Sequence, residues 1–469
     1  MTTFISATAL PPATPRGRNT AVLSLLCCVQ FLLVLDVTVV NVALPELRAD
    51  LLLSTAQAQW ALTAYLVPFG ALLLVGGRLG DRYGRRRVLV AGMVLFAVGN
   101  LLAAVSTGFA WLVLARALTG VGAAAASPSA LALLVTCFPS GPAHARAFAA
   151  WGGVGAAGAA AGVLLGGLLT SWLGWRAVFA IAVPVTTLLI AAAPRLLPRA
   201  LPSRPRTVDL LGALLSAAAA GACLLALGRT SELGWNAPEV HAWHTVATAA
   251  VVLLWLHLRR ARDPLVDLEL LHRRTVLAGT TLMACAAGTL VCAFLLTSLL
   301  LQERLGHSAL RTGLEFLPAA VATAVAARRA GALVGRWGSR PVAAVGLTSA
   351  ALGALALAAA ANAGPLTVGL ALTLLSAGLG AVFVVAGMTT MAGMRPGEAG
   401  VLAGLSTTAH ELGAGTVVAL AVAVTVTAGG PDLRTGFLCL AGVAAGGLVV
   451  ALTGLRAGDG VGARRGFAH

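Results

Sequence analysis

The chain has 469 residues, of which 59% are hydrophobic and 10% are charged. Soluble domains carry about 25% charged residues, so this composition excludes a chain built mainly from soluble domains. The formal net charge is +16, but the arginines stand in short links between apolar stretches, where they orient membrane helices. We therefore expect an all-α membrane protein surrounded by lipid, without a nucleic-acid partner.

A membrane-spanning helix needs about 20 mostly apolar residues. By that measure the sequence predicts fourteen transmembrane helices. The first apolar run is too long for a signal-peptide core of about 7–15 residues, so we expect it to remain as the first helix. In chain order the predicted helices cover residues 21–44, 58–77, 88–106, 110–136, 148–171, 176–194, 208–228, 241–258, 276–301, 313–333, 342–362, 366–391, 401–428 and 435–455.

The arginines are distributed unevenly between the two sides of this arrangement. With a cytoplasmic N-terminus, most of them fall in cytoplasmic links, and six fall on the opposite side: Arg48, Arg176, Arg229, Arg304, Arg311 and Arg434. Cytoplasmic links of membrane proteins are enriched in arginine and lysine. The pattern therefore predicts a multi-pass protein of the cell membrane with both termini in the cytoplasm.

One segment of the sequence recurs. Residues 77–86 read GRLGDRYGRR and residues 331–340 read GALVGRWGSR, with five identical positions at an offset of 254. Two related halves are typical of transporters with parallel repeats. We expect a tail at 1–20, a six-helix half at 21–194, a linker with two inserted helices at 195–275, a second six-helix half at 276–455 and a tail at 456–469.

The first copy of this repeat is a link between two predicted helices. Glycine permits a tight turn there, and Asp81 can cap a helix or pair with a nearby arginine. The segment resembles the signature between helices 2 and 3 of the major facilitator superfamily. The resemblance implies the fold of that superfamily. It also implies that this loop governs the switch of the protein between inward-facing and outward-facing states. Its residues here are Gly77, Asp81, Arg82, Gly84, Arg85 and Arg86.

Two charged residues are predicted to lie within the membrane. Asp36 stands in the sequence LDVTVVNVALP of the first helix, and Arg116 stands in LVLARALTGVG of the fourth. An ionisable group at that depth costs about 2.5–3.5 kcal/mol and marks a functional site by default. Hydration near the outer surface is the alternative for both. The two segments resemble signatures of the fourteen-helix drug:proton antiporters. The resemblance implies that Asp36 couples protons or faces the substrate and that Arg116 takes part in proton transfer.

The fifth predicted helix carries glycines at every fourth position, Gly158, Gly162 and Gly166, followed by Gly167. Small residues at this spacing let two membrane helices pack closely. The stretch resembles the antiporter signature of this helix, with Val163 standing where the family has proline. The resemblance implies antiport, with these four glycines as packing residues.

A third ionisable residue, Glu411, lies inside the thirteenth predicted helix, and His410 adjoins it. A histidine can titrate near neutral pH when hydrated. Neighbours on a helix point about 100° apart, so the two need not pair. We predict that Glu411 joins Asp36 and Arg116 in proton coupling or in the substrate cavity.

No catalytic nucleophile, phosphate loop or metal cluster is recognisable in the sequence. We therefore expect no enzyme activity, cofactor or metal. The resulting prediction is a monomeric secondary transporter that exports drugs or antibiotic-like molecules in exchange for protons. The alternatives are a dedicated exporter of a metabolite, such as a siderophore or an amino acid, and a non-transporting membrane receptor or scaffold.

Overall fold

The structure is a computed structural model. It describes residues 16–138, 141–198, 209–261, 264–307, 309–360, 364–395, 398–425 and 433–455. Regular structure in these ranges is helical: α1 (Arg16–Asp50), α2 (Thr55–Tyr83), α3 (Arg85–Ala104), α4 (Phe109–Cys137), α5 (Gly141–Leu173), α6 (Trp175–Ala180), α7 (Ala182–Leu196), α8 (Leu210–Leu233), α9 (Pro238–Arg260), α10 (Leu268–His272), α11 (Arg274–Leu299), the π-helix η1 (Leu300–Arg304), α12 (Ala309–Trp337), α13 (Ser339–Ala359), α14 (Pro365–Thr390), α15 (Ala399–Thr425) and α16 (Leu433–Gly454).

Twelve stretches of helix among the described residues are long and apolar enough to cross a membrane. One of them consists of α6 and α7, which are separated at Ile181. The helices α5 and α15 are 33 and 27 residues long, but each includes side chains outside the described set. The structure therefore supports twelve of the predicted crossings. The crossings at 148–171 and 401–428, and with them the count of fourteen, stay predictions.

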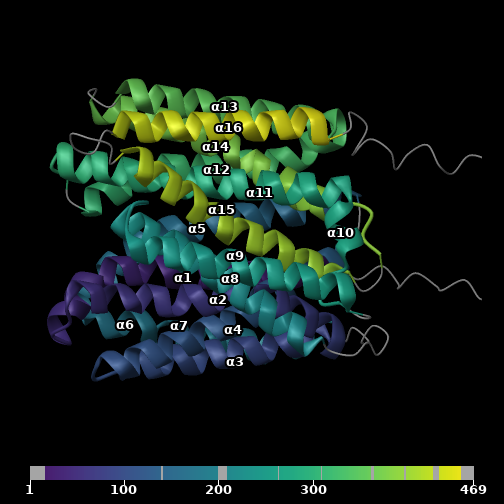
Figure 1. The fold of residues 1–469 in the computed structure, drawn as a ribbon, viewed down its shortest axis with the longest axis horizontal. Helices are drawn as coiled ribbons and strands as arrows, with labels where there is room; N and C mark the ends of the chain where they lie inside the picture. Colours follow the sequence, from purple (N-terminus) through teal and green to yellow (C-terminus); the bar gives the residue numbers. More distant parts are fainter. Residues whose placement is uncertain are drawn as a thin grey trace, which may run out of the picture.

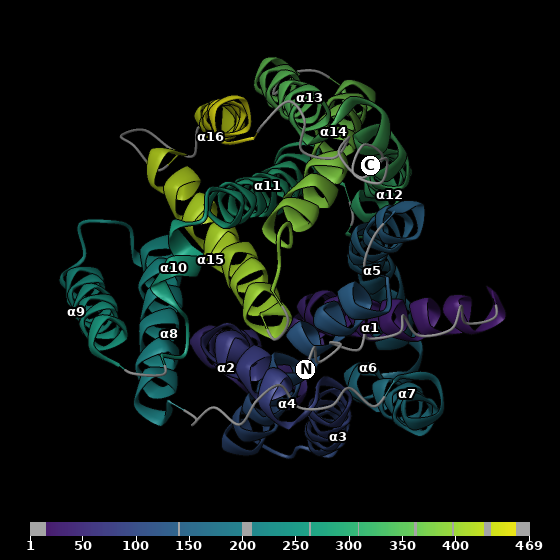
Figure 2. The same cartoon turned by 90° about the vertical axis from the view of Figure 1, so that its right-hand side faces the viewer.

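The helices form two groups with two seams between them. α1–α7 gather on one side of the bundle and α11–α16 on the other (Figure 1). Within the groups, α3 packs on α4, α1 on α5, α12 on α14 and α11 on α15. The two seams between the groups are the contact of α5 with α12 and the contact of α2 with α15. The pair α8 and α9 lies outside both groups, and α8 contacts α2 and α15 (Figure 2).

The repeated sequence segment produces the same turn twice. Gly84 joins α2 to α3 with φ of +95°, and Gly338 joins α12 to α13 with φ of +85°. A residue with a Cβ atom rarely adopts this backbone conformation. The two glycines therefore allow each pair of helices to follow one another with almost no intervening loop.

The glycines of α5 differ in what surrounds them. A Cβ atom on Gly158 would lie 3.1 Å from the Phe31 carbonyl oxygen, and one on Gly166 would lie 3.1 Å from the Cβ of Val42. A Cβ atom on Gly162 would collide with Thr38, whereas none of the described atoms lies within 4 Å of that position on Gly167. The first three glycines thus form the contact with α1, and Gly167 lies outside it.

Replacing Gly162 with leucine is expected to destabilise the protein, because the new side chain must displace α1. Overpacking a helix interface costs about 1–3 kcal/mol. We expect a lower temperature of thermal unfolding in detergent for Gly162→Leu. Gly167→Leu is the matched control on the same helix and should unfold close to the wild type; equal losses in the two variants would contradict this packing.

Candidate functional site

Asp36 of α1 and Arg116 of α4 form an ion pair inside the first group of helices. The Arg116 Nη1 atom donates to Asp36 Oδ2 at 2.8 Å, and the side chains are 0% and 3% exposed for Arg116 and Asp36. Arg116 Nε also donates to the Ala61 carbonyl oxygen of α2 at 2.9 Å. The structure thus brings together the two charges that the sequence predicts to lie within the membrane, and α2 contributes a further hydrogen-bond acceptor to Arg116.

Aromatic rings surround the Arg116 guanidinium. Its central carbon lies 4.7 Å from the ring centre of Tyr65 and 5.5 Å from that of Phe179. Among the described residues neither Arg116 Nη2 nor the Tyr65 hydroxyl has a hydrogen-bond partner, although both atoms are buried. Buried polar groups are normally satisfied. These two groups are therefore positioned to bind a water molecule or a polar group of a ligand.

A second buried acid, Asp81, joins the two groups of helices at the end of α2. Its Oδ1 atom accepts from Arg85 Nη2 at 2.8 Å and from the Gly400 N–H at 3.1 Å, while Oδ2 accepts from the Val401 N–H at 3.2 Å. Gly400 and Val401 belong to the first turn of α15. An acid at a helix N-terminus is stabilised by the unpaired N–H groups and by the helix dipole. The contact thus ties α2 to α15.

The remaining residues of the predicted switch loop make contacts with several neighbouring segments. Gly77 approaches the backbone of Gly400 so closely that a Cβ atom would collide with the carbonyl oxygen. Arg86 Nη1 donates to the carbonyl oxygens of Pro194 and Leu197 at 3.1 and 3.2 Å and thereby caps the end of α7. Arg82 stacks on the neighbouring Tyr83 ring. In the second repeat Gly335 replaces the acid, and a Cβ atom built on Gly335 would meet none of the described atoms of other helices within 4 Å.

A network of surface ions flanks the start of α15. Arg273 makes two hydrogen bonds to Glu398, of 2.8 and 2.9 Å, and Arg395 contacts Glu269 at 3.2 Å. Burial raises the pKa of the Glu398 carboxyl, but hydrogen bonds from Arg273 and from the Arg395 backbone outweigh it and hold that pKa below its usual value. The carboxylate therefore stays charged at neutral pH and holds α15 against the start of α11.

Glu411 lies in the middle of α15, apart from the Asp36–Arg116 pair. Its Oε1 atom is 3.1 Å from His410 Nδ1, and the Glu411 side chain is 22% exposed. The His410 ring lies 5.9 Å from that of Phe383 on α14. The Tyr65 ring, by contrast, lies against Arg116 within the first group of helices.

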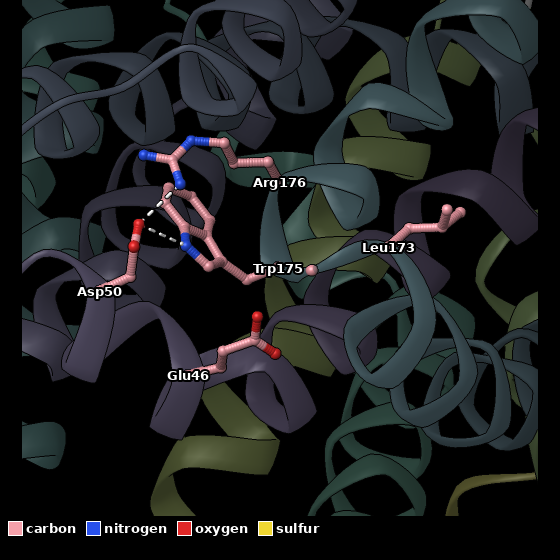
Figure 3. Close-up of a pocket in the computed structure, with 6 residues that line it drawn as sticks. Glu46, Asp50, Leu173, Trp175 and Arg176 are labelled. Atoms are coloured by element: carbon pink, nitrogen blue, oxygen red, sulfur yellow. Dashed lines mark hydrogen bonds and ion pairs between the residues drawn. The ribbon is translucent and has the colours of Figure 1, made fainter.

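At the C-terminal end of α1 lies a shallow pocket of about 110 Å³ (Figure 3). Asp50 accepts from Arg176 Nη1 at 2.6 Å and from the Trp175 indole N–H at 3.1 Å, and Glu46 lines the same pocket. Arg176 also reaches the Ser106 carbonyl oxygen at 3.2 Å. These contacts hold the ends of α1 and α6 together.

Sequence reasoning did not identify Tyr65, Arg273 or Glu398. Tyr65 is one of only two tyrosines in the chain and falls in a predicted membrane helix, which is the signal that could have selected it. Arg273 and Glu398 lie in polar links 125 residues apart. Their pairing depends on how the helices pack and leaves no pattern in the sequence.

A bundle of membrane-length helices in two groups, with buried charges inside it and an acid bound across one seam, is the architecture of a secondary transporter. The family model described as Major Facilitator Superfamily matches residues 26–418. The chain belongs to this superfamily, whose members are transporters rather than enzymes.

Relatives at 36–37% identity carry names that refer to export or resistance, or to a transporter type. The cephamycin export protein CmcT of Amycolatopsis lactamdurans is 36% identical over 92% of this chain and 89% of the relative. The puromycin resistance protein pur8 of Streptomyces alboniger is 36% identical over 83% and 78%. The uncharacterized MFS-type transporter EfpA of Mycobacterium tuberculosis is 37% identical over 66% of this chain, and the match spans only 58% of its own length.

Solved structures share the fold. The human organic anion transporter MFSD10 superposes with a TM-score of 0.69 at 17% identity, over 93% of this chain and 100% of that chain. The proton:xylose symporter XylE superposes with a TM-score of 0.67 at 15% identity, over 95% and 97%. Identity this low supports the fold alone.

Arg116→Met alone is expected to destabilise the protein more than the double change Asp36→Leu/Arg116→Met. The single change leaves a buried carboxylate unpaired, which costs about 3–5 kcal/mol, whereas replacing both ions by apolar residues is often neutral. Chemical unfolding of the purified variants in detergent measures the difference. If Asp36→Leu/Arg116→Met is less stable than Arg116→Met, then losing the partner does not leave Asp36 as a costly unpaired charge, and the expectation is wrong.

Proposed function

We propose that this protein exports antibiotic-like small organic molecules from the cell in exchange for protons. The observation that carries the proposal is the buried Asp36–Arg116 ion pair, held at 2.8 Å within helices of membrane length. Ionisable groups at this depth are costly and mark proton or substrate pathways. A membrane protein without transport activity has no need of them.

The relatives support export over import. Cephamycin, puromycin and tetracenomycin C appear in the names of export or resistance proteins that are 32–36% identical to this chain. These compounds differ in chemistry, so the names support a class of substrate, antibiotic-like organic molecules, rather than one compound. A dedicated metabolite exporter is the second candidate, favoured by the relative named after cephamycin export alone.

The proposal includes a membrane topology. We infer fourteen crossings, the twelve supported by the described residues together with α5 and α15. Helices α1–α7 and α11–α16 then form two six-crossing halves, residues 21–194 and 276–455, with α8 and α9 inserted between them. The arginine-rich Asp81 end and both termini lie in the cytoplasm, as the distribution of arginine favours.

In this topology, the contact between Asp81 and α15 supports a state closed toward the cytoplasm. Asp81 binds the N-terminus of α15 at that end. Alternating access requires this contact to break when the halves rock toward the inward-facing state. We propose that a proton taken up from outside neutralises Asp36 and weakens its attraction to Arg116, and that the resulting movement of α1 and α4 releases α15.

Asp36→Asn is expected to abolish proton-coupled export, because the amide cannot take up a proton. Proteoliposomes with an imposed pH gradient and an interior pH dye measure the coupling. Adding antibiotics of several classes should dissipate the gradient in wild-type vesicles and leave it unchanged in Asp36→Asn vesicles. Glu411→Gln tests the second acid in the same assay.

Asp50→Asn is the matched control, since Asp50 is an exposed acid on the same helix, at its C-terminal end. It should retain coupling close to that of the wild type. Full coupling in a correctly folded Asp36→Asn protein would remove Asp36 from the mechanism. A wild-type protein that is folded but unresponsive to every antibiotic would favour the dedicated metabolite exporter.

A further inference from the structure

Glu411 faces the seam where α2 and α15 meet. Gly77 packs against Gly400 and Leu73 packs against Gly404, so the two helices run antiparallel. Continuing this register along both helices brings Glu411 opposite Leu66. The carboxylate therefore lies about midway along the seam.

The same face of α15 carries further residues that point toward α2 and α8. Positions 404, 408, 411 and 415 recur at helical spacing and share one side of the helix. The Thr408 hydroxyl and the Tyr65 hydroxyl are buried and have no hydrogen-bond partner among the described residues. The seam thus contains a carboxylate and the unpaired Thr408 hydroxyl group, while the Tyr65 ring turns toward Arg116 of α4.

Such a seam needs protection from lipid. A carboxylate or an unpaired hydroxyl that faces the hydrocarbon core is unfavourable, and intramembrane acids face the protein interior or a water-filled cavity. α8 lies along the outside of the seam, in contact with α2 on one side and α15 on the other, and α9 lies beyond it (Figure 2). α8 is therefore the element that separates Glu411 from lipid.

The contacts of α8 with the two helices differ in kind. Leu224 fills the space beside Gly70 of α2 so tightly that a side chain there would collide with it, and a Cβ atom on Gly221 would lie 3.5 Å from the Cβ of Ala71. Against α15, the Leu227 side chain lies over Gly415, with 3.4 Å between Cδ1 and the position of a Cβ atom. The contact of Leu224 with Gly70 leaves no room for a side chain, whereas the contact of Leu227 with Gly415 is an ordinary van der Waals contact.

The pair α8 and α9 is also held together at its other end. Asp209 caps α8 by accepting from the Gly212 N–H at 2.7 Å, and it lies 2.8 Å from His257 Nε2 near the end of α9. Asp209 accepts from the Leu265 N–H at 3.1 Å as well. One carboxylate thus joins the start of α8, the end of α9 and the following link.

We propose that α8 is fixed to α2 and covers the seam between α2 and α15, which keeps lipid away from Glu411 while α15 slides beneath Leu227. This assigns a function to the inserted helices. The inference rests on the proposed alternating access and on the proposed proton role of Glu411. It predicts that the cover depends on the side chains of Leu224 and Leu227.

The first test measures how fast a lipid-soluble carbodiimide, dicyclohexylcarbodiimide, labels Glu411 in liposomes, with peptide mass spectrometry to locate the adduct. The wild type should label slowly. Leu224→Ala/Leu227→Ala should label at least about tenfold faster. In the wild type α8 must move away locally before the reagent reaches Glu411, whereas in the double variant the covering side chains are absent. The control Leu211→Ala/Leu214→Ala removes side chains that are 56% and 61% exposed on the same helix and should match the wild type.

Equal labelling rates in the two double variants would overturn the cover. Because labelling needs no transport, the result is independent of the proposed function. Fast labelling in Leu224→Ala/Leu227→Ala together with normal coupling in Glu411→Gln would support the cover and remove the proton role of Glu411. Unchanged labelling in Leu224→Ala/Leu227→Ala together with lost coupling in Glu411→Gln would overturn the cover and support the proton role of Glu411.

A second test uses engineered disulfides and does not depend on the alanine variants. The Cβ separations are 3.5 Å for Ala71→Cys/Gly221→Cys and 3.7 Å for Leu227→Cys/Gly415→Cys, within the range of disulfides. The α2–α8 bond should leave transport at the wild-type rate. The α8–α15 bond should stop it until a reductant is added. The opposite pattern would show that α8 moves with α15 and would overturn its attachment to α2.

Discussion

The structure depends on a constraint set by the membrane: a charge placed inside it must be compensated within the protein. Asp36 and Arg116 meet this constraint by pairing at 2.8 Å, with the Ala61 carbonyl and the Tyr65 ring completing the shell around the guanidinium. The pair draws α1, α2 and α4 together. Neutralising the carboxylate would therefore change the packing of three helices at once, which is the physical basis of the proposed coupling to protons.

Asp81, which the proposed topology places at the cytoplasmic end of α2, is compensated in another way, by the backbone N–H groups at the start of α15 and by Arg85. Its contact spans the two groups of helices, whereas the Asp36–Arg116 pair lies within one of them. α2 takes part in both sites. We infer that α2 transmits the state of the buried pair to the seam. The second repeat, where Gly335 replaces the acid, offers no matching contact among the described residues, so closure at this end is asymmetric.

Much of this arrangement follows from local sequence. Apolar length predicted most of the crossings, and the intramembrane positions of Asp36 and Arg116 marked both as functional candidates before their pairing was visible. The break at Ile181 and the loose position of Gly167 depend on neighbouring helices, so helical spacing alone did not reveal them. The partners of Asp81 lie 319 and 320 residues away. A bond to a backbone N–H selects for no particular side chain, and sequence patterns cannot show it.

The central claim is that the charge state of Asp36 controls the seam at Asp81. The most direct measurement is the distance between spin labels at Tyr83→Cys and Ala392→Cys, exposed positions on either side of that seam, with the exposed native Cys28 replaced by serine. Acidification should shift the wild type toward longer distances. Asp36→Asn, which mimics the protonated acid, should give the longer distances already at neutral pH. A distance distribution in Asp36→Asn that matches the neutral wild type and still lengthens on acidification would contradict the account.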